Sequence, residues 1–213
     1  MKTHKFLILL FIIFSAFQLH AAANNFQNIN DSYLFSQSFF PISEGSSNQK
    51  KIANYLKDFA DKNNLTYKET KISGSTYETN AVNIELTLNG TADENGTILI
   101  AAPLNSVYTN GKFYDFSLSQ CLALQVLETA CENPPQKNLK VVFLGANSAP
   151  QETSYGMQQF LRENSGLFVN TFAILLDINN SFTPVTVSAS KNGKNAPALI
   201  LEKLFKCIKK NNN

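Results

Sequence analysis

Three short runs of almost purely apolar residues constrain the fold of this chain more than any other feature. The runs cover residues 98–102, 139–145 and 172–176. Successive side chains of a strand point to opposite faces of a sheet, so a run without polar alternation predicts a strand covered on both faces. Stretches with a helical spacing of apolar residues separate and follow these runs, at 118–131, 153–162 and 197–209.

Two earlier segments, 65–72 and 81–88, alternate between apolar and polar residues, and a helical pattern at 49–63 precedes them. The alternation predicts strands that are buried on one face only. Strands that alternate with helices favour parallel pairing through right-handed crossovers, and the two alternating strands favour an antiparallel edge. The predicted fold class is therefore α/β, a three-layer helix–sheet–helix sandwich with a mostly parallel central sheet and an antiparallel edge.

The first 23 residues have the features of a cleaved secretory signal. Lys2 and Lys5 precede an apolar run at 6–17, and three alanines occupy positions 21–23. The apolar run is too short to anchor the chain in a bilayer. We therefore expect export to the periplasm or the medium, with no membrane anchor after the signal is cleaved.

The rest of the chain is predicted to form an arm over residues 24–48, which is rich in Asn and Ser, and a single domain over 49–213. The signal holds two of the 18 Lys and Arg residues and none of the 16 Asp and Glu residues, so the remainder is neutral. A neutral domain has no electrostatic reason to bind nucleic acid or anionic lipid. We expect neither as a partner.

Both histidines of the chain, His4 and His20, lie in the predicted signal. After cleavage the protein contains no imidazole. This excludes the Ser-His-Asp and Cys-His hydrolases, zinc sites with histidine ligands, and a general base with an ordinary pKa near neutrality.

Four segments carry motifs whose order and spacing are informative. Residues 98–107 form an apolar run that ends in Ala-Ala-Pro-Leu-Asn-Ser-Val, and Asp115 precedes Phe-Ser-Leu-Ser at a predicted helix start. Residues 143–148 read Phe-Leu-Gly-Ala-Asn-Ser, and the run 174–177 ends in an aspartate. Between about residues 43 and 180 the chain thus resembles the di-zinc aminopeptidase family, which includes bacterial leucine aminopeptidases, glutaminyl cyclases and the protease-like domain of the transferrin receptor. The resemblance implies a zinc-exopeptidase-like fold.

The same resemblance implies that most of the zinc site is lost. Pro103 takes the place of the first zinc-binding histidine, and Asn105 takes that of the carboxylate which orients it. Asn147 stands at the general-base glutamate and Ser148 at a ligand glutamate, and neither side chain can do that chemistry. The family's last histidine falls beyond the equivalent of Asn213.

Asp115 and Asp177 are the two ligand positions that the resemblance leaves intact. Two carboxylates make a poor zinc site, because zinc takes four donors with nitrogen or sulfur prominent among them. We expect Asp115 to cap the helix that starts near Ser117, and Asp177 to accept hydrogen bonds from loop amides. A calcium ion held by the two aspartates and nearby carbonyls is the alternative for this pair.

The resulting prediction is an exported, catalytically inactive aminopeptidase-like domain that binds a peptide or a protein partner and needs no cofactor. Ligands of such folds bind beyond the carboxyl ends of the parallel strands. The predicted crevice there is formed by Pro103, Asn105, Tyr108, Tyr114, Asp115, Asn147, Ser148 and Asp177.

Two alternatives remain open at this point. The chain is an active metallo-aminopeptidase if zinc finds other donors, from Asp115, Asp177, Glu152 or a partner chain. It is a truncated remnant of a longer enzyme if the further strands and helices that the resemblance implies are missing from the fold.

Overall fold

The computed structural model describes residues 33–73, 78–92, 96–109, 111–146, 154–166, 171–178, 190–191 and 194–195. The chain divides into two compact units, Met1–Asn180 and Ser181–Asn213. The described part of the second unit is an antiparallel pair, β8 (Ser190–Lys191) and β9 (Lys194–Asn195). The predicted signal and the helix expected over 197–209 lie outside the described residues.

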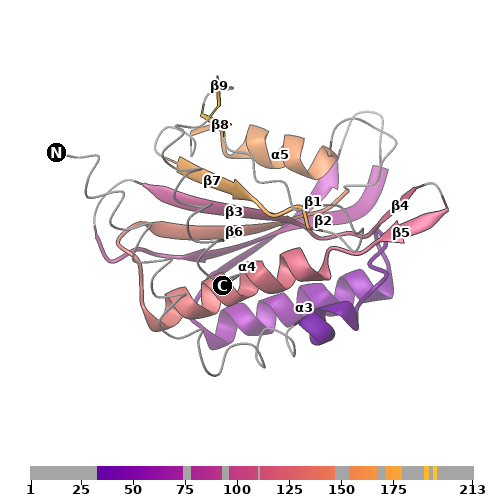
Figure 1. Ribbon diagram of the computed structural model, residues 1–213, viewed down its shortest axis with the longest axis horizontal. Coiled ribbons are helices and arrows are strands. Elements are labelled where there is room, and N and C mark those ends of the chain that lie inside the picture. Colours follow the sequence, from indigo (N-terminus) through magenta and orange to yellow (C-terminus); the bar gives the residue numbers. More distant parts are fainter. Residues whose placement is uncertain are drawn as a thin grey trace, which may run out of the picture. The chain divides into compact units, whose positions relative to one another are not determined.

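A five-stranded sheet with the order β1-β2-β6-β3-β7 forms the centre of the first unit (Figure 1). Its strands are β1 (Thr66–Ser73), β2 (Glu78–Leu88), β3 (Thr97–Pro103), β6 (Asn138–Leu144) and β7 (Thr171–Leu175). β1 and β2 form the antiparallel edge, and β2 is also antiparallel to β6. β3 is parallel to both β6 and β7. The described sheet is therefore mixed, with two parallel and two antiparallel pairings.

Helices cover both faces of this sheet. α3 (Ser47–Lys62) and α4 (Ser117–Glu132) lie on one face, and α5 (Tyr155–Glu163) lies on the other (Figure 1). The larger apolar core lies between the sheet and α3 and α4, and a smaller one, centred on Phe160, lies under α5. The predicted helix–sheet–helix sandwich is confirmed.

The start of α3 follows from local chemistry. The hydroxyl of Ser46 accepts a hydrogen bond from the backbone N–H of Gln49 at 3.1 Å and so satisfies one of the free donors of the first turn. Ile52, Leu56 and Ala60 recur at helical spacing and are buried against the sheet. This amphipathic face docks the helix.

The expectation of a half-buried strand over 81–88 is wrong on the polar side of that strand. Asn83 and Glu85 are buried along with the apolar residues that alternate with them. α5 covers this face, where the Asn83 side chain donates to the carbonyl of Gly156 at 2.8 Å. Glu85 is paired there with Lys68 at 3.0 Å and with Lys140 at 2.7 Å. Polar partners replace solvent on this face.

The predicted arm contacts the domain through aromatic rings. Phe35, in a helical turn over residues 33–37, lies 4.7 Å from Tyr55 of α3 between ring centroids. Phe39 lies 5.1 Å from Phe35 and 6.2 Å from Tyr55. Such tilted and edge-on ring pairs stabilise the docking of one segment on another.

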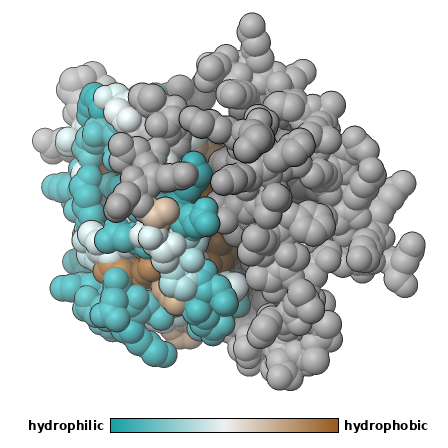
Figure 2. All heavy atoms as spheres, turned by 90° about the vertical axis from the view of Figure 1, so that its left-hand side faces the viewer, coloured by the Kyte–Doolittle hydropathy of each residue, from teal (hydrophilic) through white to brown (hydrophobic). Residues whose placement is uncertain are grey.

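Among the residues described, no helix is both long enough and apolar enough to span a bilayer. Figure 2 views the molecule from the left-hand side of Figure 1. Hydrophilic residues cover most of the described surface there, and a narrow band of hydrophobic residues shows between them. The apolar side chains thus gather mainly between the layers.

Candidate functional site

The candidate site lies where the parallel strands β3 and β7 end and α4 begins. A two-stranded hairpin, β4 (Val107–Thr109) and β5 (Lys112–Tyr114), connects the end of β3 to α4 and projects from this edge of the sheet (Figure 1). The end of β6 lies at the same edge, because β6 is parallel to β3. Three segments that are distant in sequence therefore meet here, as the resemblance implies.

Pro103 is buried at the last position of β3. The pairing of β3 with β6 continues to Pro103 opposite Leu144, but the pairing with β7 ends at Ala101. Proline has no backbone N–H, so it cannot continue the ladder toward β7. Its carbonyl accepts a hydrogen bond from the Gln120 side chain at 3.1 Å. Pro103 therefore acts through its backbone, and it has no side-chain donor for a metal.

Asn105 is the centre of a buried polar network, with only 1% of its surface exposed. Its Nδ2 donates to Gln49 Oε1 at 2.9 Å and to the carbonyl of Ile42 at 3.3 Å. Its Oδ1 accepts from the backbone N–H of Ala146 at 3.0 Å. Gln49 in turn donates to the carbonyl of Asn80 at 2.8 Å. The carboxamide is thus used on both sides, and a carboxylate has no N–H to replace Nδ2.

A second buried asparagine, Asn83, binds Gly145, which precedes Ala146 in the segment after β6. Its Oδ1 accepts from the backbone N–H of Gly145 at 3.0 Å. Ala146 has a φ of 50°, an unusual conformation for a residue with a Cβ. A Cβ on Gly156 would overlap the Gly145 carbonyl oxygen, so glycine allows α5 to approach Gly145. Asn83 and Asn105 together fix Gly145 and Ala146, the two described residues that follow β6.

Asp115 accepts hydrogen bonds from the first residue of α4, which is close to the predicted role, although the N-cap residue itself is Phe116 and has no side-chain cap. Its Oδ1 accepts hydrogen bonds from the backbone N–H of Ser117 at 2.9 Å and from the Ser117 hydroxyl at 2.6 Å. Burial and then the charge of Asp115 raise the pKa of Tyr33 above its usual value. The carboxylate is buried and already serves as a hydrogen-bond acceptor at a helix start.

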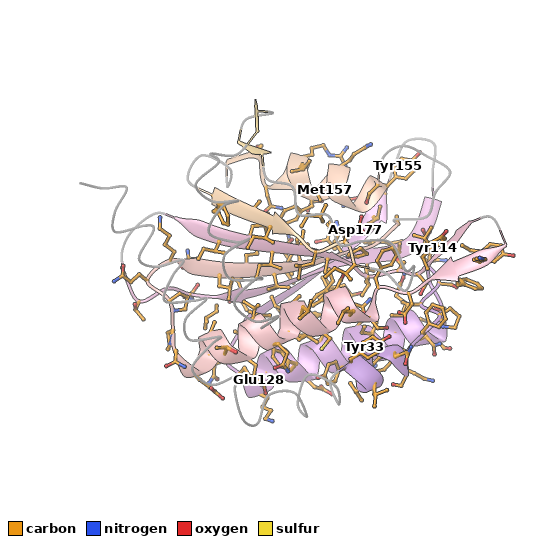
Figure 3. All side chains as sticks on the ribbon, in the orientation of Figure 1. Tyr33, Tyr114, Glu128, Tyr155, Met157 and Asp177 are labelled. Atoms are coloured by element: carbon orange, nitrogen blue, oxygen red, sulfur yellow. The ribbon has the colours of Figure 1, made fainter. Side chains whose placement is uncertain are left out.

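Asp177 follows β7 and is exposed. The hydroxyl of Ser119 fixes the next residue: it donates to the carbonyl of Ile178 at 3.0 Å and accepts from the N–H of Ile178 at 2.8 Å. Figure 3 shows Asp177 at the same end of the sheet as Tyr114. Both retained aspartates therefore border the first turn of α4.

We expect Ser119→Ala to lower the free energy of unfolding by about 1–2 kcal/mol, because the partly buried N–H and C=O of Ile178 lose their partner. The amide of Ile178 should also exchange hydrogen faster, which hydrogen-exchange NMR measures. Ser47→Ala, on an exposed position of α3, is the control and should change neither. An unchanged exchange rate at Ile178 would show that Ser119 does not hold this segment.

The two tyrosines predicted to line the crevice differ in their surroundings. Tyr108 is 56% exposed on the hairpin, and its ring centroid is 4.7 Å from that of Phe113. Tyr114, opposite the buried Val107, is half-buried. Asn147 and Ser148, like Glu152, lie outside the described residues. The described members of the predicted crevice are therefore Pro103, Asn105, Tyr108, Tyr114, Asp115 and Asp177.

Sequence reasoning missed the polar residues that organise this end of the sheet. Gln49 occupies the buried face of α3, and Ser119 and Gln120 occupy that of α4. A polar residue on the core-facing side of a predicted helix indicates such an organising role, because it needs a buried hydrogen-bond partner. The partners themselves, such as the carbonyl of Leu104, are backbone groups that no residue type reveals.

The described residues do not fit a zinc ion. They contain no group of three or more His, Cys, Asp and Glu side chains that could hold a metal. The carboxylates in the described part of the site are Asp115, which already accepts two hydrogen bonds from Ser117, and the exposed Asp177. Zinc in proteins normally takes four donors.

No protein-family model and no curated protein sequence matches this chain. Solved structures do match it. A glutaminyl cyclase from an Acidobacteriales bacterium has a TM-score of 0.58 and 16% identity over 70% of this chain and 57% of its own. A leucine aminopeptidase precursor from Bacteroides thetaiotaomicron has a TM-score of 0.56 and 16% identity, over 69% of this chain and 61% of its own.

A zinc-dependent exopeptidase from Parabacteroides distasonis matches with a TM-score of 0.53 and 15% identity, over 69% of this chain and 59% of its own. The chain thus spans 57% to 61% of the length of these three structures. At such low identity the likeness concerns the fold. The chain has the fold of the bacterial zinc-dependent exopeptidases and glutaminyl cyclases, as the resemblance in its sequence implied.

Proposed function

We propose that this chain is an exported, catalytically inactive domain of the aminopeptidase-like fold, which binds a peptide or a protein partner without a metal cofactor. The binding surface is the crevice at the ends of the parallel strands. Export is supported by Lys2 and Lys5 before the apolar run at 6–17.

The observation that carries the proposal is the set of hydrogen bonds that the Asn105 side chain makes. The resemblance to the aminopeptidase family implies a carboxylate at this position, which would orient a zinc-binding histidine. Here the side chain donates to Gln49 and Ile42 and accepts from Ala146, so both of its N–H groups and its oxygen hold backbone and helix in place. Pro103, at the position of that histidine, has no donor atom. The ligand and the group that would orient it are thus replaced together by structural residues.

The state of Asp115 supports the same conclusion. A free ligand carboxylate would turn its oxygens toward an open metal position, whereas Oδ1 of Asp115 faces Ser117. The first turn of α4 would lose a cap if this oxygen were turned to a metal. A binding role needs none of these ligands.

The second candidate is a metallo-aminopeptidase with altered ligands. It is favoured by one observation, that Asp115 and Asp177 border the same turn of α4. Such an enzyme would need further donors from residues outside the described part or from a partner chain.

Peptidase and cyclase assays separate the two candidates. Aminoacyl nitroanilides and peptides with N-terminal glutamine are incubated with the purified protein alone, with added zinc or cobalt, and with a chelator. We expect no turnover above the buffer rate in any condition. Turnover that depends on zinc or cobalt and stops with the chelator would establish the second candidate instead.

A further inference from the structure

The hairpin of β4 and β5 carries an aromatic surface that the fold does not use. Tyr108 and Phe113 lie directly opposite each other in the strand register and are 56% and 42% exposed. Their ring centroids are 4.7 Å apart, and Phe40 packs edge-on against Phe113 at 6.1 Å. Three neighbouring rings therefore form a row, which we call the hairpin platform.

The alternation of the hairpin explains why this face is free. Val107 and Tyr114, the next pair in the register, are buried and half-buried, so their face packs on the domain. Tyr108 and Phe113 point to the opposite side, because successive side chains of a strand alternate. The exposed rings thus add little to the core. If residues 107–114 only connected β3 to α4, the hairpin would not need two aromatic residues on its exposed face.

The charge of the hairpin limits what can bind there. Lys112 is the one charged residue between positions 107 and 114. A basic side chain would be repelled by Lys112, so a cation is a poor occupant of these rings. A neutral apolar group, or one with an acidic residue beside it, fits this charge.

The size of the surface also limits the occupant. A stable protein–protein interface buries about 800 Å² on each partner. The three rings of the platform, each of about 150–250 Å² in total and each only partly exposed, supply a fraction of that area. The platform therefore suits a short extended segment rather than a second copy of this chain.

We propose that the hairpin platform binds a proline-containing peptide segment in the polyproline II conformation. One turn of that helix has three residues and rises about 9 Å, which is the scale of a row of three rings with these spacings. Aromatic rows bind such segments because the proline rings stack on them and the extended backbone is already ordered. This names the partner chemistry of the binding role proposed above and rests on that proposal.

Titration with an acetylated and amidated peptide of nine prolines tests the inference. The readout is the shift of backbone amide signals in two-dimensional NMR, since the chain has no tryptophan to report by fluorescence. We expect shifts centred on residues 107–114, and none with a glycine–serine peptide of equal length. Tyr108→Ala and Phe113→Ala should each weaken binding about tenfold. Leu161→Ala removes an exposed side chain of α5 and should leave binding unchanged.

Three results would overturn the inference: no shifts at millimolar peptide, binding that Tyr108→Ala leaves unchanged, or a dimer that forms through the hairpin at high protein concentration. None of these results bears on whether the protein binds zinc or hydrolyses peptides, because zinc titration and the peptidase assays test those two properties. Conversely, zinc-dependent turnover together with proline-peptide binding would refute the inactive domain and keep the platform.

Discussion

Replacing Asn105 by aspartate is expected to lower the free energy of unfolding by about 3–5 kcal/mol at pH 7. The substitution restores the type of residue that the resemblance places at this position. It also exchanges Nδ2, which donates to Gln49 and to Ile42, for an oxygen that faces two acceptors. The new carboxylate would be almost fully buried, and none of the described hydrogen-bond partners of Asn105 is a cation that could neutralise it.

The penalty should depend on pH in a defined direction. Burial favours the neutral form of a carboxyl group, so the pKa of the new aspartate is higher in the folded than in the unfolded chain. The unfolded state then loses its proton first as the pH rises above about 4, and the variant loses stability from there upward. Below that pH the side chain is protonated in both states and the penalty is smallest.

Denaturant unfolding of the wild type and of Asn105→Asp, at pH 4 and pH 7, measures this effect. Asn89→Asp serves as a control, because Asn89 is exposed, and should change stability by less than about 0.5 kcal/mol. Equal stability of wild type and Asn105→Asp at pH 7 would mean that the site accepts a carboxylate. The network around Asn105 would then not depend on a neutral amide at this position.

The second large effect concerns the buried ion pairs of Glu85. Its side chain is 3% exposed and contacts Lys140 at 2.7 Å and Lys68 at 3.0 Å, while Lys68 also lies 3.6 Å from Glu163. Glu85→Gln leaves the ammonium group of Lys140 largely buried without a counter-charge. Breaking a buried pair costs about 3–5 kcal/mol. The partial exposure of the two lysines screens their charges, so we expect about 2–3 kcal/mol here.

The pH dependence of this effect has the opposite sign. Burial acts to raise the pKa of Glu85, but the hydrogen bonds and charges of Lys140 and Lys68 outweigh it and the pKa is lowered from 4.5. A lowered folded-state pKa stabilises the protein above the unfolded value, and this contribution is lost as the pH falls through the folded value. The difference between wild type and Glu85→Gln should therefore be full at pH 7 and shrink below about pH 4.5.

Thermal and denaturant unfolding at pH 7 and pH 3 measure the difference. Glu132→Gln, at the exposed end of α4, is the matched control and should behave as the wild type does. A difference that is the same at both pH values would mean that Glu85 acts by packing and not by its charge.

The layers of the fold could be predicted from the sequence because they follow from the period of the apolar residues. The apolar runs became β3, β6 and β7, and the helical patterns at 49–63, 118–131 and 153–162 became α3, α4 and α5, each within two residues at either end. The alternating run at 81–88 misled on one point, since its polar face is buried under α5. Periodicity reports which residues are polar, but it does not report whether a helix will supply them with partners.

The site could be predicted only in part. That Asp115 binds the start of α4 follows from an aspartate two residues before a predicted helix, and its hydrogen bonds to Ser117 are present, although Phe116 is the N-cap residue. The Gln49–Asn105 pair joins residues 56 positions apart. A single sequence gives no sign of such a distant contact. Of the hairpin platform, the sequence indicates only Tyr108, because its pairing with Phe113 depends on the register of the hairpin.

The metal content of the purified protein tests the central claim most directly. Mass spectrometry gives the bound metal, and calorimetry with zinc gives the affinity of the protein for an added ion. We expect no bound metal and no zinc binding at micromolar concentrations. Pro103 has no side-chain donor for a metal, the Asn105 side chain is held in hydrogen bonds, and Oδ1 of Asp115 accepts from Ser117 at the start of α4. One zinc ion per chain, bound tightly, would contradict the account and establish a metal site with other ligands.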